Sequence, residues 1–338
     1  MAWQVISSMA QLNQMTILSI EDLEEALGVH KFKQYVDQCE ANFERQLTDV
    51  VKTASEDLRI KAIFVSGPTS SGKTTLARRL AAAVKQSGRH AAVISLDDYY
   101  FVKSIRYDAW GRPDFESLDT LDIELMVSQF TDLLAGQTVT LPVFNFASRS
   151  RSFPLENQLT LKDHDLVIVE GLHGLHESIS GRLPRAAWLG VFIMPWCSLL
   201  DGRQLLGSRD LRMLRRISRD VVHRGSTALS TIDYWPMIDR TEQEFFPTYL
   251  KRADVYINSC LSYEFCVIAP KAYHQILISL QQYEDETLPG SIYLNGTGGY
   301  ADLDSALAEA RMLAAACQHI PMIDHLEVPP ESILREFI

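Results

Sequence analysis

The sequence predicts an α/β fold in which a mostly parallel sheet carries helices on both faces. From Ile60 onward, short apolar runs alternate with stretches of helical periodicity, which is typical of parallel strands joined by crossover helices. A glycine-rich turn joins the first apolar run to the first helical stretch. Several of the runs end in polar or acidic residues, at the edge where open α/β sheets bind ligands. A composition with 46% hydrophobic residues is sufficient to bury a sheet of this kind.

Residues 1–57 are predicted to form a helical extension. Ser19 begins a capping-box-like pattern, and Gly28 closes the short amphipathic helix that follows. A longer helix runs from Phe32 to about Ser55, because its apolar residues recur at three- and four-residue steps. Neither helix carries residues that suggest chemistry, so we expect both to pack on the main domain, residues 58–338.

The main domain is predicted to alternate strands with helices. The strands are Ala62–Val65, Ala91–Ser95, Leu166–Val169, Leu189–Met194 and Asp254–Ile257. The helices are Lys73–Val84, Ile123–Leu134, an arginine-rich helix around Arg209–Val222, and Leu303–Cys317. The first two helices are closed by Gly88 and Gly136.

The strongest motif joins the first strand to the first helix. Gly67–Thr74 reads G-x-x-x-x-G-K-T, the P-loop pattern of nucleotide-binding proteins. Its glycines let consecutive backbone N–H groups point at phosphate oxygens, and the helix N-terminus adds partial positive charge. Lys73 is expected to reach the β- and γ-phosphates of ATP, and Thr74 to offer its hydroxyl to Mg²⁺. The predicted loop contacts with ATP are Gly67, Thr69, Ser70, Ser71, Gly72, Lys73, Thr74 and Thr75.

Acidic residues follow the next two strands. Asp97 and Asp98 come just after the second strand, and Glu170 ends the third. A carboxylate at this edge can accept the proton of an attacking hydroxyl or hold Mg²⁺, and phosphoryl transfer needs both functions. The sequence therefore predicts a phosphotransferase with Asp97 or Asp98 as the base and Glu170 orienting Mg²⁺, directly or through water. A loop of solvated acids is the alternative. His173 and His176 have no third metal ligand nearby, so we expect them to be loop residues.

The arginine-rich helix gives an acidic protein one basic face, formed by Arg212, Arg215, Arg216 and Arg219. Such a face can fold over ATP, place guanidinium groups on phosphate oxygens and exclude water, which is the role of a kinase lid. We therefore expect a lid around residues 203–240. A solvated basic surface is the alternative.

Composition and charge disfavour other classes of protein. The net charge of −11 makes nucleic acid a poor partner. No apolar run is long enough for a membrane span and no export signal is recognised, so we expect a cytoplasmic protein. The scattered cysteines indicate neither disulfides nor a zinc site. The N-K-x-D motif of GTPases and the L-S-G-G-Q signature of ABC-type ATPases are both missing from the sequence.

These motifs resemble the uridine kinase and phosphoribulokinase branch of P-loop kinases, from about Lys61 to Ile338. They occur in that family's order: Asp97-Asp98-Tyr99-Tyr100, Leu141–Phe146, Ile168–Gly171 and Arg212–Asp220. Further segments are similar to a larger bacterial subtype, although its TGS domain is not recognisable here; they are Trp235-Pro236, Asp254–Ser259 and Ser332–Ile338. The resemblance implies a P-loop NTPase fold with a helical lid, ATP and Mg²⁺ as cofactors, a small-molecule acceptor, and assembly as a dimer or tetramer.

The resemblance also implies roles for single residues. It makes Asp97 the catalytic base and gives Lys73 and Thr74 to ATP and Mg²⁺. Arg212 and Arg215 of the lid are assigned to ATP. The residues assigned to the acceptor are Asp98, Tyr100, Glu116, Phe144, Arg149, Arg151 and Arg216.

The sequence does not decide between two chemical classes of acceptor, a nucleoside and a sugar phosphate or polyol. Where uridine–cytidine kinases use a Tyr and a His on the pyrimidine, this chain has Phe144 and Arg149, and where they use an Asp on the ribose it has Glu116. A later Arg and Gln of those kinases appear here as Ser226 and Tyr234. Arg149, together with Arg151, would suit a sugar phosphate or polyol. Aromatic residues favour a nucleoside, because their faces stack on a planar base; they are Tyr99, Tyr100, Phe115, Phe144 and Phe146.

A function of a different class also fits the sequence. The P-loop could switch the surface of a nucleotide-dependent regulatory module, with the N-terminal helices as its docking element. The two classes differ in one observable, because only a kinase yields a phosphorylated acceptor.

Overall fold

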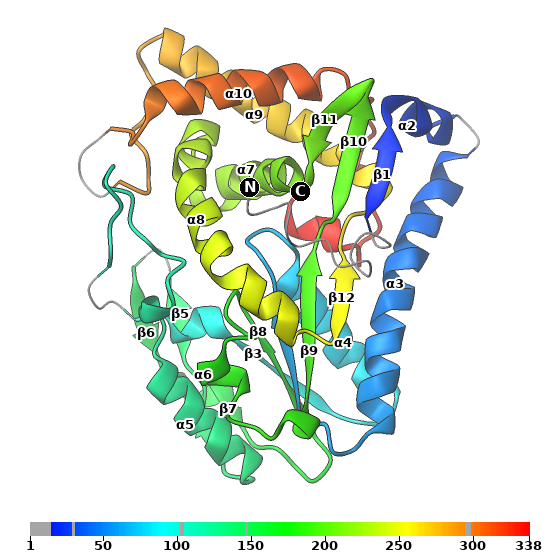
Figure 1. The fold of residues 1–338 in the computed structure, drawn as a ribbon, viewed down its shortest axis with the longest axis vertical. Coiled ribbons are helices and arrows are strands. Elements are labelled where there is room, and N and C mark those ends of the chain that lie inside the picture. Colours follow the sequence, from blue (N-terminus) through cyan, green and yellow to red (C-terminus); the bar gives the residue numbers. More distant parts are fainter. Residues whose placement is uncertain (1–14, 29–30, 102–104, 146–147, 295–298) are drawn as a thin grey trace.

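A five-stranded parallel sheet forms the centre of the molecule (Figure 1). The structure is a computed structural model that describes residues 15–28, 31–101, 105–145, 148–294 and 299–338. The strand order is β12-β9-β2-β8-β3, and every neighbouring pair is parallel. The strands are β2 (Ala62–Ser66), β3 (Ala91–Ser95), β8 (Leu166–Glu170), β9 (Trp188–Met194) and β12 (Val255–Asn258). The predicted α/β fold and its strands are thereby confirmed.

The alternation of side chains along β2 shows how the two faces of the sheet are covered. Ile63 and Val65 pack on one face against α3 (Phe32–Glu56) and α4 (Lys73–Gln86). Phe64 points to the other face, where it meets α5 (Ile123–Leu134) and the C-terminal part of α8 (Ala228–Arg252). Because both faces are buried, the strand is apolar throughout, as expected of a parallel sheet.

A helical lobe stands beyond the C-terminal edge of the sheet (Figure 1). It consists of α7 (Ser208–Arg224), α8, α9 (Phe265–Glu284) and α10 (Leu303–Cys317). The sequence predicts α7 and α10, but its periodicity does not indicate α8 and α9. These two helices contain Pro236, Pro247 and Pro270, and a proline inside a helix removes a backbone hydrogen bond. Tertiary packing offsets this cost, since neighbours such as Trp235 are fully buried in the lobe.

The N-terminal segment contributes a strand as well as helices. β1 (Thr16–Ser19) pairs in parallel with β10 (Cys197–Asp201), which pairs in turn with the antiparallel β11 (Arg203–Gly207). The predicted capping box at Ser19 is present at the start of α2 (Ile20–Ala26). α3 then buries its apolar side against the sheet, so the segment up to residue 56 shares a core with the strands that follow it.

Short elements complete the fold on the side of α5. Two small antiparallel pairs lie there, β4 (Val139–Thr140) with β7 (Gln158–Leu159) and β5 (Val143–Asn145) with β6 (Ser150–Ser152). The one-turn helix α6 (Glu177–Ser180) follows β8. Among the described residues, no helix combines the length and apolar character that a membrane crossing needs.

Candidate active site

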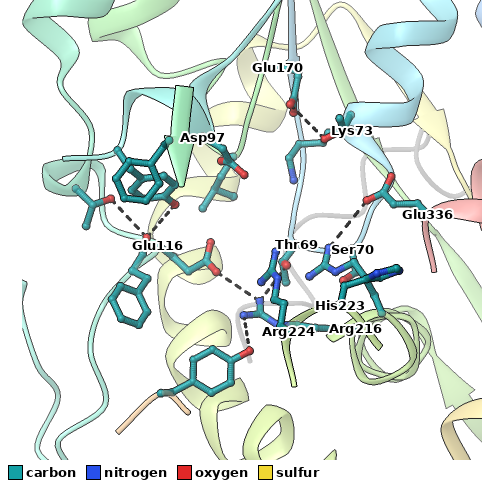
Figure 2. Close-up of a pocket in the computed structure, with 18 of the residues that line it drawn as sticks. Thr69, Ser70, Lys73, Asp97, Glu116, Glu170, Arg216, His223, Arg224 and Glu336 are labelled. Atoms are coloured by element: carbon teal, nitrogen blue, oxygen red, sulfur yellow. Dashed lines mark hydrogen bonds and ion pairs between the residues drawn. The ribbon is translucent and has the colours of Figure 1, made fainter. Parts of the chain in front are cut away.

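A cavity of about 510 Å³ opens at the C-terminal edge of the central sheet (Figure 2). The P-loop, the loops after β3 and β8, the β5–β6 region, α7 and the C-terminal segment all contribute to its wall. The predicted site residues that line it are Thr69, Ser70, Gly72, Lys73, Thr74, Asp97, Tyr100, Glu116, Phe144, Arg149, Glu170 and Arg216. The sheet edge therefore gathers residues that lie more than a hundred positions apart.

Close packing fixes the backbone of the P-loop. A Cβ atom at Gly67 would lie 2.2 Å from the carbonyl oxygen of Ile193. Gly72 has a φ of +89°, and a Cβ atom there would lie 2.2 Å from Ile333 of the C-terminal segment. Both positions therefore require glycine. The hydroxyls of Ser70 and Ser71 are buried and have no hydrogen-bond partner within the described residues, which leaves donors for phosphate oxygens.

Lys73, Thr74 and Glu170 form a polar group at the start of α4 (Figure 2). Lys73 Nζ donates to the carbonyl oxygen of Pro68 at 2.8 Å. The Thr74 hydroxyl donates to Glu170 Oε1 at 3.2 Å, and Ser95 Oγ donates to the same oxygen at 2.7 Å. A hydroxyl beside a carboxylate at a P-loop fits Mg²⁺, which binds few protein ligands and completes its shell with phosphate and water.

Two neighbouring carboxyl groups titrate above their usual range. Burial raises the pKa of Glu170 to about 7, with a further increase from Asp97 and an opposing effect of Lys73. Burial also raises the pKa of Asp97, again opposed by Lys73. A carboxylate with a raised pKa is a better proton acceptor, so this environment suits a general base.

The structure separates the roles of the two adjacent aspartates. Asp97 lines the cavity, whereas Asp98 does not. Asp98 instead accepts a hydrogen bond from the backbone N–H of Phe144 at 3.1 Å, which fixes strand β5. Of the two aspartates, Asp97 is therefore the one that faces the cavity.

The acceptor side of the cavity combines aromatic rings with charges. Glu116 Oε1 lies 3.5 Å from Arg216 Nη1. The rings of Tyr100 and Phe144 lie 5.7 Å apart, centroid to centroid. Arg149 places its guanidinium 4.8 Å from the centroid of the Phe115 ring and has no carboxylate partner within the described residues.

The predicted acceptor residue Arg151 lies away from the cavity, as do the two positions, Ser226 and Tyr234, at which uridine–cytidine kinases carry Arg and Gln. Arg151 pairs with Asp122 at 2.8 Å and is not part of the wall. Tyr234 is buried, donates its hydroxyl to the Pro113 carbonyl and is likewise outside the wall, as is Ser226. Phe146 lies outside the described residues.

Arg212 and Arg215 do not form the basic face that the sequence predicts. Both side chains are fully buried, and they pair with Glu242 and Glu264 from outside α7. The other two members of the predicted face, Arg216 and Arg219, do line the cavity, and the helix adds His223 and Arg224 to them. Arg212 and Arg215 therefore belong neither to the expected lid face nor to the alternative, a solvated surface, because acidic partners remote in sequence hold these side chains in the interior.

His173 is a structural residue rather than a metal ligand. Its Nε2 donates to the Glu116 carbonyl at 2.8 Å, and its Nδ1 accepts from the Tyr249 hydroxyl at 2.6 Å. Burial lowers its pKa to about 4, which agrees with a neutral ring. Across the described residues, no cluster of three or more His, Cys, Asp or Glu side chains is arranged to hold a metal.

Comparison with known proteins adds the family. The sequence model of the Phosphoribulokinase / Uridine kinase family matches residues 62–263. The chain belongs to this family. It is 28% identical to a uridine kinase of Macrococcus caseolyticus over 199 residues, which are 58% of this chain and 86% of that protein. It is 27% identical to a uridine kinase of Halobacterium salinarum, covering 58% and 79% of the two chains.

One solved structure is among those similar to this chain. It is described as a possible uridine kinase from Bacillus stearothermophilus and superposes with a TM-score of 0.43 and 21% identity, covering 64% of this chain and 99% of the other. Membership of the Phosphoribulokinase / Uridine kinase family makes this chain a phosphotransferase of the P-loop kinase type, for which ATP is the usual donor.

Part of the cavity lies outside the region that the family shares. Tyr293 and Glu336 line the cavity, although the family match ends at residue 263. Glu336 accepts a hydrogen bond from the Thr75 hydroxyl at 2.8 Å and lies 4.0 Å from Arg219. The sequence marks Ser332–Ile338 only as a segment of resemblance and assigns Glu336 no role, because 261 positions separate it from Thr75. His223 and Arg224 are not predicted either, although they follow Arg216 and Arg219 on the same helix.

Proposed function

We propose that this member of the Phosphoribulokinase / Uridine kinase family transfers the γ-phosphoryl group of ATP, with Mg²⁺, to a hydroxyl of a nucleoside. The observation that carries the proposal is the position of Asp97, which shares one cavity with the P-loop lysine and with Glu170. A base, a phosphate cradle and a carboxylate for the metal are the parts that phosphoryl transfer requires.

Each part has a distinct role in this proposal. Lys73 releases the Pro68 carbonyl and binds the β- and γ-phosphates, while the P-loop N–H groups hold the phosphate chain. Thr74 and Glu170 would hold Mg²⁺, which neutralises charge on the phosphates when bound. Asp97 orients the attacking hydroxyl and accepts its proton on a carboxylate oxygen. Arg216 and Arg219 face the cavity and stabilise negative charge.

The nucleoside is supported by the acceptor wall and by the relatives. Tyr100 and Phe144 offer neighbouring aromatic faces, which suit a planar base. Glu116 can accept hydrogen bonds from ribose hydroxyls. The relatives from Macrococcus caseolyticus and Halobacterium salinarum are uridine kinases, although their identity to this chain is below 30%.

A phosphorylated sugar is the second candidate, and Arg149 favours it. This guanidinium lines the cavity without a carboxylate partner within the described residues, so it is available to a substrate phosphate. The two candidates differ in charge and in aromatic character, which makes them separable by a substrate panel.

The test is a coupled assay of ADP release across nucleosides, pentose phosphates and polyols, at fixed ATP and Mg²⁺. We expect ADP release that depends on uridine or cytidine. If only a phosphorylated sugar stimulates release, the nucleoside proposal is wrong.

A cytoplasmic location and assembly as a dimer or tetramer stay predictions.

A further inference from the structure

The inner side of α7 is tied to the backbone of the P-loop. Arg215 donates from Nη1 to the carbonyl oxygen of Ser70 at 3.1 Å. It also donates from Nε and Nη2 to both carboxylate oxygens of Glu264, at 2.9 Å each, and to the Ser259 carbonyl at 2.8 Å. The side chain is fully buried. Every nitrogen of this guanidinium therefore has an acceptor within the protein.

Arg212 makes similar contacts one turn earlier through Nη1 and Nη2, whereas its Nε has no hydrogen-bond partner within the described residues. Its Nη2 donates to Glu242 Oε2 at 2.7 Å, and its Nη1 donates to the other oxygen of that carboxylate. Nη1 also lies 3.5 Å from the carbonyl oxygen of Thr69. Trp235 packs on this guanidinium, as Phe337 packs on that of Arg215. The two arginines thus meet consecutive carbonyl groups of the P-loop.

A phosphate cradle needs such contacts for a geometric reason. The loop can point its N–H groups at an anion only if the carbonyl groups of the same residues point elsewhere. Ser70 has a φ of +57°, a conformation that residues other than glycine adopt infrequently. Its carbonyl group then faces the protein interior, where an unpaired acceptor is costly. Arg215 supplies the donor that this carbonyl requires.

The same ion pairs keep both arginines away from the nucleotide. To bind a phosphate, Arg215 would have to leave Glu264 as an unpaired buried charge, and Arg212 would leave Glu242 in the same state. Glu242 lies on α8, and Glu264 lies in a short 3₁₀ helix after β12, so α7 is held from two sides. Swinging α7 as a lid would break both pairs at once.

We propose that Arg212 and Arg215 are positioning residues that hold the P-loop in its phosphate-binding shape, and that phosphate contacts from α7 are made by its cavity side instead. This rests on the proposed function, because it assumes that the P-loop binds ATP. It replaces the assignment of Arg212 and Arg215 to direct ATP contact.

The experiment compares ADP and ATP affinity by calorimetry with Mg²⁺ present. The main variant is Arg215→Met combined with Glu264→Gln, which removes the Ser70 contact without leaving a buried unpaired charge. P-loop N–H groups bind phosphates that ADP and ATP share. We therefore expect both dissociation constants to rise by the same factor, about tenfold, as for one or two lost hydrogen bonds.

Arg209→Met is the matched control. Arg209 lies on the same helix and is anchored to α8 and α10 through Asp239 and Glu309, but it contacts no part of the P-loop among the described residues. We expect this variant to lower Tm without changing either dissociation constant. If the double variant changes affinity no more than Arg209→Met does, the positioning role is wrong.

A second variant keeps the proposal testable if the double variant does not fold. Glu264→Gln preserves the shape of the side chain but weakens the hold on Arg215, so both affinities should fall by about two- to threefold. If Arg215 were instead a direct phosphate ligand, Glu264→Gln would have the opposite effect. Arg215 would no longer be neutralised by Glu264, so its charge would strengthen ATP binding more than ADP binding. That result, or a loss of ATP affinity alone in the double variant, overturns the proposal. If the unaltered protein binds neither ADP nor ATP, the proposed function is refuted, and not only the positioning role of the two arginines.

Discussion

The two halves of the cavity are built in different ways. On the donor side, residues 67–72 form one continuous loop that leads into α4, and we expect its backbone N–H groups to do most of the binding. On the acceptor side, Glu116, Phe144, Arg149 and Arg216 come from separate segments, and their side chains provide the chemistry. A binding site formed by backbone groups of one loop can be predicted from a short sequence motif. A site formed by side chains from separate segments depends on how the whole chain folds. The predictions below test whether the two halves also separate in function.

The largest effect is expected at the boundary between the halves, at Asp97. Asp97→Asn should lower kcat by roughly a hundredfold or more, because it removes the proton acceptor, while the affinity for ATP changes little. Steady-state kinetics and calorimetry measure the two quantities. Asp98→Asn is the control, since Asp98 faces Phe144 N–H rather than the cavity, and its kcat should fall by less than about tenfold. A rate that survives Asp97→Asn with altered Mg²⁺ dependence would make Asp97 a metal group instead.

Lys73→Ala should affect the donor half alone. We expect ATP affinity to fall by about a hundredfold, as for loss of charge-assisted hydrogen bonds to two phosphates. Calorimetry on the folded variant measures this change. Lys85→Ala, in the last turn of the same helix and exposed, should bind ATP like the unaltered protein. Equal affinity in Lys73→Ala and Lys85→Ala would contradict the P-loop assignment.

Arg149→Ala should affect the acceptor half alone. We expect the KM for the acceptor to rise about tenfold if the substrate carries a phosphate, and by less than threefold if it is a nucleoside. The KM for ATP should stay constant in both cases. Arg151→Ala serves as the comparison, because Arg151 pairs with Asp122 away from the cavity. A large rise in the KM for ATP would show that the two halves are not separable.

The last prediction concerns stability rather than catalysis or binding and involves His173, which joins the loop after β8 to the acceptor loop through Glu116. Its pKa is about 4 in the folded protein, against about 6.5 when unfolded, so below pH 6.5 the unfolded chain takes up a proton that the folded chain excludes. Stability should therefore fall as the pH drops from 6.5 to 4, by up to about 3 kcal/mol from this group. Urea unfolding at several pH values would show it. The free energy of unfolding should depend less steeply on pH in His173→Gln. An unchanged pH dependence would show that other groups cause the effect.

The same contrast explains what the sequence can predict. The five strands of the central sheet, α4, α5, α7 and α10 follow from local periodicity, and the P-loop follows from eight adjacent residues, whereas β1, β10 and β11 are not predicted. Helices α8 and α9 are missed because tertiary packing overrides three prolines. The inward turn of Arg215 depends on Glu264, 49 positions away, and nothing local reveals that pairing. Glu336 reaches the cavity through a contact of still greater sequence separation.

The central claim is that both halves serve one phosphoryl transfer, and ³¹P NMR of the reaction products tests it most directly. The protein is incubated with ATP, Mg²⁺ and the acceptor that gives the highest ADP release, alongside Asp97→Asn. The account predicts a phosphomonoester signal equal in amount to the ADP formed, and its near absence with Asp97→Asn. Slow release of inorganic phosphate, equal with and without acceptor and unaffected by Asp97→Asn, would contradict it and favour a nucleotide-dependent regulatory module.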